Sequence, residues 1–317
     1  MHFQSKTYSL LGICFEVISA PEITKQLEAE LILRSIKKKR GPGAAFYALL
    51  GHLEGLSPKA KVQHSGNFIT HHSSGRNCRS SIWDLGKRAC ICVGACVPDL
   101  LDELEQAIFI KVTHELRAKN RICLHASMVH IRGRSICFVG PSNSGKTCMA
   151  LAMVSNGATL VANDKVFFNH ASILARPFPL DIIRVNPIAY ESATGCETNE
   201  LVQSSERYEK VRIETRKDPI LSSHIDHGKR EVDMLIFPQL NPDLSEPFLE
   251  RISSRETKRR LTCCRITSTL QEDSTSSPED TWADSIQRFL KLPSYVLHTG
   301  LNWKKSAAKV LELMNHS

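Results

Sequence analysis

The chain is poor in aromatic residues and lacks any long apolar segment. Phe, Trp and Tyr make up 6% of its 317 residues, and no nucleic-acid-binding module is recognisable, so a DNA or RNA role is a minor option. No stretch approaches the ~20 apolar residues that a membrane helix needs. The apolar run at 10–20 imitates a signal-peptide core, but Glu16 interrupts it and no cleavage site is evident. We therefore expect a cytoplasmic protein that binds neither nucleic acid nor membrane.

The composition is ordinary for a globular protein, with an excess of positive charge. Hydrophobic residues make up 42% and charged residues 23% of the chain, whose length suits one large domain or two ordinary ones. Lys and Arg number 41 against 33 Asp and Glu, which gives a formal net charge of +8. Such an excess favours an anionic ligand such as a nucleotide, or an acidic partner.

The eleven cysteines are numerous but show no disulfide framework. Several lie inside apolar runs, namely Cys14, Cys123, Cys137 and Cys148. Small buried thiols in a reducing compartment account for them best. Cys90-Ile91-Cys92 with Cys96 superficially resembles a metal site, but its apolar neighbours favour strand packing. The adjacent Cys263-Cys264 pair lies between basic residues and is assigned no role.

The most informative segment is G-P-S-N-S-G-K-T at residues 140–147, which matches the phosphate-binding pattern G-x-x-x-x-G-K-[ST]. An apolar run precedes it and an Ala-, Leu- and Met-rich stretch follows, so a strand comes before and a helix after, as the motif requires. Backbone N–H groups and the helix N-terminus then face phosphate oxygens. Lys146 is expected to reach the β- and γ-phosphates, and the Thr147 hydroxyl to ligate Mg²⁺. The predicted nucleotide site comprises Gly140, Pro141, Ser142, Asn143, Ser144, Gly145, Lys146 and Thr147.

The first 120 residues predict a smaller α+β region. Alternating apolar residues at 5–20 indicate one or two strands, and Pro21 opens a helix that ends at the cationic run 37–40. Short strands are predicted at 67–71, 81–85 and 89–93. A helix at 98–118 has one apolar face and marks the boundary between this region, 1–120, and a nucleotide-binding region, 121–317.

In the second region, segment 123–131, the turn 132–134 and the strand before the phosphate loop predict a hairpin. Asn156-Gly157 ends the helix that follows the loop, and segment 159–164 is a strand with polar residues at its tip. An acid at the tip of a strand that neighbours the phosphate-loop strand is where a second Mg²⁺ contact is expected. Asp164 is therefore the candidate metal-side acid.

Segment 173–190 contains three prolines and suits edge strands beside the site. Arg176 and Arg184 are candidate phosphate or substrate contacts there, although an exposed arginine is the default interpretation of each. The polar segment 191–231 suggests a mobile loop or lid, which would suit a kinase. Within it, His224 and His227 form a weak metal pair because no further ligand is close.

The last part of the chain predicts a buried strand at 232–237 that Pro238 ends. Six cations between 251 and 265 follow at helical spacing, and they form either a solvated face or a wall facing an anion. After a polar linker, a helix at 282–290, a strand at 295–298 and a helix at 303–314 close the chain. The alternation of strands and helices without repeats indicates an α/β fold.

The stretch from His125 to Asp164 resembles the C-terminal catalytic domain of HPr kinase/phosphorylase and its relatives, which include kinases of precursor peptides in natural-product pathways. The shared features are His-Ala-Ser-x-Val before the hairpin, Gly133 in its turn, the phosphate loop, and Leu-Val-Ala-x-Asp after the helix. The resemblance covers about residues 121–312, strongly in the first 45 and weakly afterwards. The first 120 residues do not resemble the N-terminal domain of that family.

The resemblance implies a mixed sheet with flanking helices, as in phosphoenolpyruvate carboxykinase, and the use of ATP and Mg²⁺ to phosphorylate a hydroxyl, commonly a serine, of a peptide or small protein. It also leaves assembly into a homo-oligomer open. His125 matches the family's active-site histidine and Asp164 its metal-associated aspartate. Asn163 stands where the family has its presumed general base, and an amide cannot accept a proton as a carboxylate does.

Three functions remain open from the sequence. The chain is a kinase in which His125 or a substrate group accepts the proton, a nucleotide-binding pseudokinase that acts as a sensor or scaffold, or an enzyme that transfers a nucleotidyl group on the same scaffold. Losing help from a general base costs about 10²–10⁴-fold in rate, which slows a kinase without necessarily abolishing it.

Overall fold

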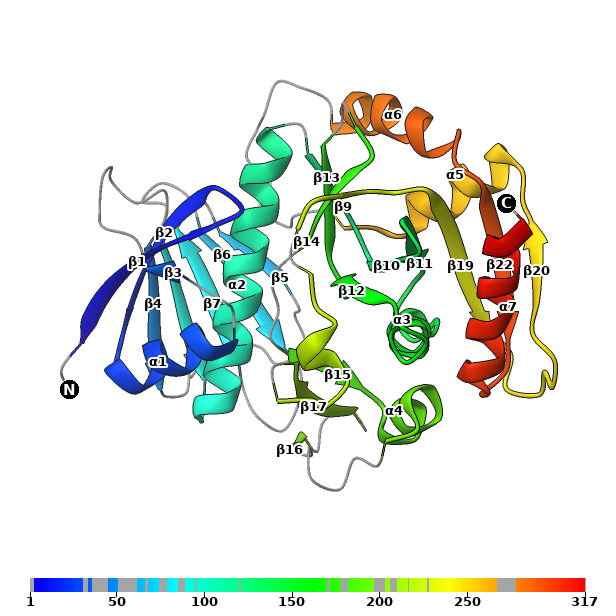
Figure 1. The fold of residues 1–317 in the computed structure, drawn as a ribbon. Coiled ribbons are helices and arrows are strands. Elements are labelled where there is room, and N and C mark those ends of the chain that lie inside the picture. The colour runs from blue at the N-terminus through cyan, green and yellow to red at the C-terminus, as the bar shows by residue number, and fades with distance from the viewer. Residues whose placement is uncertain are drawn as a thin grey trace. The chain divides into compact units, whose positions relative to one another are not determined.

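The computed structural model describes residues 3–30, 34–35, 45–50, 62–65, 68–73, 79–84, 89–94, 96–119, 121–169, 172–177, 182–196, 203–205, 210–215, 217–226, 228–266 and 278–316. The chain divides into two compact units (Figure 1). Met1–Lys119 belongs to the first unit, and Asn120–Thr267 with Ser274–Ser317 forms the second. The two units are described separately below.

The first unit is an eight-stranded sheet with two helices, in the order β3-β1-β2-β4-β8-β7-β6-β5. Its strands are β1 (Gln4–Leu10), β2 (Ile13–Ser19), β3 (Arg34–Ser35), β4 (Ala45–Leu50), β5 (Val62–Ser65), β6 (Phe68–Ser73), β7 (Arg79–Asp84) and β8 (Ala89–Gly94). Its helices are α1 (Pro21–Glu30) and α2 (Val97–Ala118), and α2 packs on β8, β4 and β7. The strands predicted at 5–20, 67–71, 81–85 and 89–93 and the helix predicted at 98–118 are confirmed. The helix that Pro21 opens is shorter than predicted, because Arg34–Ser35 forms β3, and β4 was not predicted. The cationic run 37–40 lies outside the described residues.

Apolar side chains at alternate positions along the strands build the core of this unit. Tyr8, Phe15, Phe46 and Trp83 are all nearly fully buried, and their rings form successive pairs 5.6–5.9 Å apart. Cys90 and Cys92 are buried on β8 with their sulfurs 3.8 Å apart. Both side chains are thus packed in the core from a strand, as the strand-packing interpretation predicts.

The second unit is built on a six-stranded mixed sheet in the order β12-β10-β11-β19-β22-β20. Its strands are β10 (Ala126–Ile131), β11 (Arg134–Val139), β12 (Thr159–Ala162), β19 (Met234–Leu240), β20 (Phe248–Arg251) and β22 (Ser294–Thr299). Strands β11, β19 and β22 are parallel, and the other pairings are antiparallel. The mixed α/β fold predicted from the sequence is thus confirmed.

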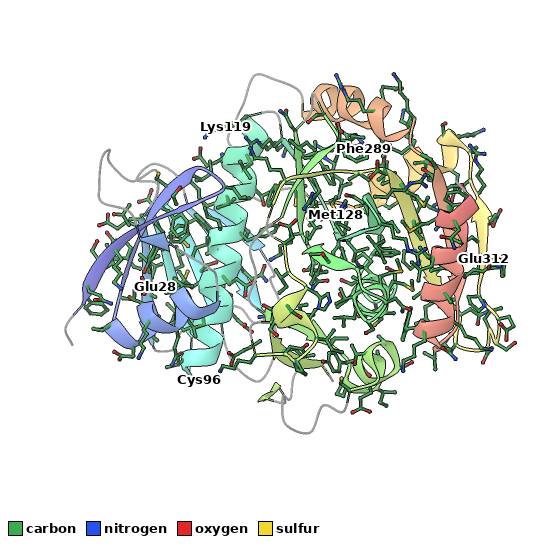
Figure 2. All side chains as sticks on the ribbon, viewed as in Figure 1. Glu28, Cys96, Lys119, Met128, Phe289 and Glu312 are labelled. Carbon is green, nitrogen blue, oxygen red and sulfur yellow. The ribbon has the colours of Figure 1, made fainter. Side chains whose placement is uncertain are left out.

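Helices α3 (Lys146–Val154), α4 (Pro187–Thr194) and α7 (Trp303–His316) share one core with this sheet. A second core contains apolar side chains of α5 (Ser254–Cys263) and α6 (Pro278–Phe289), such as Leu261 and Phe289. Phe289 lies at the end of α6 and is labelled in Figure 2. Along β10 and β11, Val129 and Phe138 belong to the first core, and Met128 and Val139 to the second. Because the sheet is covered on both faces, its strands read as continuous apolar runs in the sequence.

Two smaller sheets complete the second unit. The first has the order β18-β14-β13-β9-β21 and contains β9 (Arg121–Leu124), β13 (Val166–Asn169), β14 (Leu174–Pro177), β18 (Arg230–Glu231) and β21 (Arg265–Ile266). The second has the order β15-β17-β16 and contains β15 (Ile182–Val185), β16 (Gln203–Ser205) and β17 (Lys210–Glu214). A short 3-10 helix, η1 (Leu221–Ser223), follows.

The structure corrects four expectations. Segment 123–131 is not one strand, because it breaks at His125 into β9 and β10, which belong to different sheets. Strand β12 pairs with β10 rather than with the phosphate-loop strand β11. Of the two strands described in segment 173–190, which was expected to form edge strands, β14 is internal to its sheet and β15 lies at the edge of its sheet. Helix α4, which starts at Pro187 behind an Asn186 cap, was not expected at all.

Two further expectations, for the later part of the chain, are also corrected. Pro238 does not end its strand, since β19 continues to Leu240. Beyond Ile236, β19 pairs with β22 alone, and a strand with one neighbour tolerates a residue without an N–H. The lid interpretation fails for residues 210–215 and 217–226, because β17 pairs with β15, and Ile213 and Leu221 are fully buried. His227 lies outside the described residues. No described helix has a stretch long and apolar enough to span a bilayer.

Candidate functional site

The phosphate loop follows directly from β11 and leads into α3 (Figure 1). Gly145 caps the helix with φ +93°, and Asn143 also has a positive φ of +64°. A Cβ added to Gly140 would lie 2.3 Å from Ser144 Oγ, and one on Gly145 would lie 2.4 Å from the ring of Trp303. Both glycines of the motif are therefore required by close approach as well as, at Gly145, by backbone conformation.

Lys146 lies under this loop. Its side chain is 5% exposed, and Nζ donates a hydrogen bond of 2.8 Å to the carbonyl oxygen of Pro141. The hydrogen bond to Pro141 holds the ammonium group against the backbone of the loop. A cation held in this way, beside backbone N–H groups at a helix N-terminus, favours an anion at the loop.

Asn163 joins the loop helix to the sheet. Its side-chain oxygen accepts hydrogen bonds from Ser127 Oγ at 2.7 Å and from Thr147 Oγ1 at 3.0 Å. Ser127 is a fully buried residue of β10, Thr147 is the second residue of α3, and Asn163 follows the end of β12. One amide oxygen thus fixes the hydroxyl that the sequence assigns to Mg²⁺, with a lone pair of that hydroxyl left for a metal.

His125 and Asp164 form a pair, with Nε2 2.6 Å from Oδ1. Burial by itself raises the pKa of Asp164, but the hydrogen bond and charge of His125, followed by the charges of Lys165 and Lys146, lower it to about 2. Asp164 is therefore ionised near neutral pH and can only accept, so the shared proton lies on Nε2. In the neutral form of the imidazole with this proton, Nδ1 is the nitrogen that can accept a proton.

Backbone hydrogen bonds explain why four distant segments meet at His125. Its N–H donates to the Cys264 carbonyl at 2.9 Å, and its own carbonyl accepts the N–H of Gly140 at 3.3 Å. The N–H of Ala126 donates to the Asp164 carbonyl at 3.3 Å. Asp164 also has a positive φ of +67°, which an aspartate adopts more readily than most residues. The break between β9 and β10 is thus a junction that holds the histidine beside the phosphate loop.

The residues present fit a nucleoside triphosphate with Mg²⁺. Ser144 Oγ, which packs against Gly140, is a buried oxygen without a hydrogen-bond partner among the described residues. Lys146 supplies a buried cation, and Thr147 with Asp164 supplies the few oxygen ligands that Mg²⁺ takes from protein when phosphates provide others. The absence of a group of three ligating side chains among the described residues is compatible with this kind of metal site.

The two candidate arginines lie on strands of the two smaller sheets, not of the sheet that contains β11. Arg176 lies on β14, where its backbone pairs with Phe167, and its side chain is outside the described set. Arg184 lies on β15 of the three-stranded sheet, opposite Arg212. His224 Nδ1 contacts the Ile220 carbonyl at 2.8 Å, which is a local contact near η1 rather than a metal site.

Three contributors were not recognised from the sequence. Ser127 lies within the His-Ala-Ser motif and could have been found there as the hydroxyl two residues after the histidine. Trp303 contacts Gly145 from the start of α7, and the Cys264 carbonyl anchors His125 from the end of α5. Neither has a local signal, because each lies more than a hundred residues from its contact.

Comparison with known proteins adds little. No protein-family model matches the chain, and no curated protein matches it. Among solved structures, the Hpr(Ser) kinase/phosphatase from Coxiella burnetii is similar at 12% identity, covering 61% of this chain and 92% of that one, with a TM-score of 0.31. That score is too low to carry an argument about function. The geometry of the site has to carry it.

Proposed function

We propose that this protein is an ATP- and Mg²⁺-dependent phosphotransferase that phosphorylates a hydroxyl, serine first, of a peptide or small protein. One observation carries the proposal. Asn163 connects the phosphate-loop helix to the sheet at 3.0 Å from Thr147, while the adjacent Asp164 pairs at 2.6 Å with His125. The phosphate loop and a polarised histidine therefore lie at one site, an arrangement that supports transfer of a phosphoryl group to a hydroxyl.

When bound, Mg·ATP supplies the γ-phosphoryl group and leaves as Mg·ADP. Lys146 and the loop N–H groups hold the phosphate chain and stabilise negative charge that develops on it. Thr147 and the second oxygen of Asp164 are the residues that would ligate Mg²⁺. His125 Nδ1 accepts the proton that the acceptor hydroxyl loses, and Asp164 stabilises the resulting imidazolium through Nε2. In this assignment Asn163 positions Thr147 and does not act as a base.

A regulatory, non-catalytic nucleotide-binding protein is the second candidate, and Asn163 is the observation that favours it. The amide stands where the related kinases have their presumed base, and its oxygen is already occupied by two hydroxyl donors. The two candidates differ in one respect. The kinase uses His125 for proton transfer, whereas the regulator binds nucleotide without turnover.

Incubation with γ-labelled ATP, Mg²⁺ and serine-containing peptides tests the proposal. The wild-type protein should transfer label to an acceptor, Lys146→Ala should lose transfer, and His125→Ala should slow it by about 10²–10⁴-fold while still binding nucleotide. Lys229→Ala, which alters an exposed cation, serves as the control and should behave as the wild type. Nucleotide binding without any labelled acceptor would reject the kinase in favour of the regulator.

A further inference from the structure

Helix α5 has a cationic exposed face. Thr257 and Leu261 are buried, whereas Arg255, Lys258 and Arg259 are exposed. At about 100° per residue, these three cations fall within an arc of ~100°. The residues buried on the opposite side anchor the helix in the second core. The cations therefore belong to the outer surface of a well-packed element.

Internal ion pairs account for only part of this charge. Glu256 binds Arg259 and Arg260, with nearest N···O distances of 2.6 and 2.7 Å. The guanidinium of Arg260 also lies 5.9 Å from the centre of the Phe237 ring. Arg255 and Lys258 have no acidic partner in the part of the chain that the structure describes. One face of α5 thus presents positive charge that no acidic side chain among the described residues neutralises.

Two further exposed cations lie at the start of α5. Arg251 ends β20, three residues before the helix. Ser254 Oγ donates to the Leu290 carbonyl at 3.3 Å, which brings the neighbouring Lys291 to the same end. We call Arg251, Arg255, Lys258 and Lys291 the α5 basic face.

The other end of α5 reaches the candidate active site. The helix ends at Cys263, and the carbonyl of the next residue, Cys264, accepts the N–H of His125 at 2.9 Å. At 1.5 Å per residue, the ten residues of α5 span ~15 Å. By the same spacing of about 100° per residue, Cys264 lies on the buried side of α5, so a ligand on the basic face would cross the C-terminal end of the helix to reach His125.

We propose that the α5 basic face binds an acidic segment of the phosphate acceptor. This inference rests on the proposed function, because it assigns the acceptor its chemical class. An extended chain covers ~15 Å in about four or five residues. The acceptor hydroxyl then lies at least about five positions from a cluster of Glu or Asp. Complementary charge of this kind fixes the register of the substrate and speeds its association.

Peptide binding without ATP tests the surface independently of catalysis. The probe is a fluorescent peptide with one serine and a block of five glutamates about five positions away, made with the block on either side. A glutamine version is the uncharged control. We expect wild-type protein to bind one acidic peptide, and Arg255→Glu/Lys258→Glu to weaken that binding about tenfold at low salt. Lys146→Ala, which impairs the proposed catalysis, should bind the peptide as the wild type does.

The matched control is Lys25→Glu/Lys229→Glu, which reverses two exposed cations elsewhere and changes net charge equally. It should lower peptide affinity less than twofold. Glutamate at position 255 lies in the first turn of α5, where negative charge favours a helix, so the variant should fold. Equal loss in both variants, or none, would overturn the proposal. So would selective loss of binding to RNA or to phosphatidylserine vesicles with peptide binding unchanged, because the face would then serve another partner.

Discussion

The hydrogen bonds of Asn163 give the most specific prediction about stability. Asn163→Ala removes the acceptor of Ser127 Oγ and Thr147 Oγ1 together. Ser127 is fully buried, so its unpaired hydroxyl should cost ~1–3 kcal/mol. Thr147 is only partly buried and can turn to water, so its lost hydrogen bond should cost ~0.5–1.5 kcal/mol. We expect a total loss of about 2–4 kcal/mol in the free energy of unfolding.

Urea denaturation of four proteins measures this value: the wild type, Asn163→Ala, Ser127→Ala and the double variant. Because the two residues share a hydrogen bond, the double variant should lose ~1 kcal/mol less than the sum of the single losses. Asn315→Ala is the control, since it loses only an exposed hydrogen bond from Arg132 and should cost less than ~0.5 kcal/mol. An Asn163→Ala loss as small as this control, or strict additivity, would refute the argument that Asn163 connects the loop helix to the sheet.

Asn163→Asp separates positioning from base catalysis in the same residue. A carboxylate keeps both acceptor interactions, so the fold should be retained within ~1 kcal/mol. If His125 is the base, the turnover of this variant should stay within about tenfold of the wild type, whereas a much larger gain would identify position 163 as the base.

Three further predictions follow from contacts near the loop. Gly140→Ala should abolish nucleotide binding measured by calorimetry, because the new Cβ would lie 2.3 Å from Ser144 Oγ. Gly140→Ala/Ser144→Gly removes that clash and should restore much of the binding. Failure to restore it would contradict this cause. Burial raises the pKa of Asp164, but its histidine and lysine neighbours outweigh burial and lower the pKa from 3.8 to about 2. The pairing therefore stabilises the fold fully above pH ~3.8, and this stabilisation is lost as the pH falls through ~2. A shift of this size corresponds to ~2.4 kcal/mol in the free energy of unfolding, which we discount to about 1 kcal/mol because the side chain is 48% exposed. Urea unfolding of the wild type and of Asp164→Asn should differ by this amount at pH 6 and not at pH 2. Iodoacetamide should modify exposed Cys263 before Cys264, whose pKa burial raises to about 11; mass spectrometry that finds the reverse order would reject the packing of α5.

Local sequence signals predicted much of this fold because the elements concerned carry their own chemistry. The phosphate loop requires glycine where the chain turns sharply, and its flanking strand and helix lie where the motif places them. The α2 helix was found from its apolar face, and the β10–β11 hairpin from two apolar runs around Gly133, which has a φ of +77°. Each of these features is decided by residues within one element.

The failures share a different cause, namely contacts between distant segments. The break at His125 depends on the Cys264 carbonyl, 139 residues away, and a run of apolar residues does not show which sheet each half joins. The polar stretch that includes β17 gave no strand signal because pairing with β15 supplies its stability. Pro238 was read as a strand end because sequence alone does not show that β19 has one neighbour there.

The central claim is that this site transfers the γ-phosphoryl group of ATP to a hydroxyl. The most direct measurement is a pair of parallel reactions with Mg²⁺, one with ATP labelled at the γ-phosphate and one with ATP labelled at the α-phosphate, each containing the acidic serine peptides. Label in the peptide from γ-labelled ATP alone, lost in Lys146→Ala, is the predicted result. Label from α-labelled ATP would identify nucleotidyl transfer, and label from neither would show a site that binds nucleotide without turning it over; either result contradicts the claim.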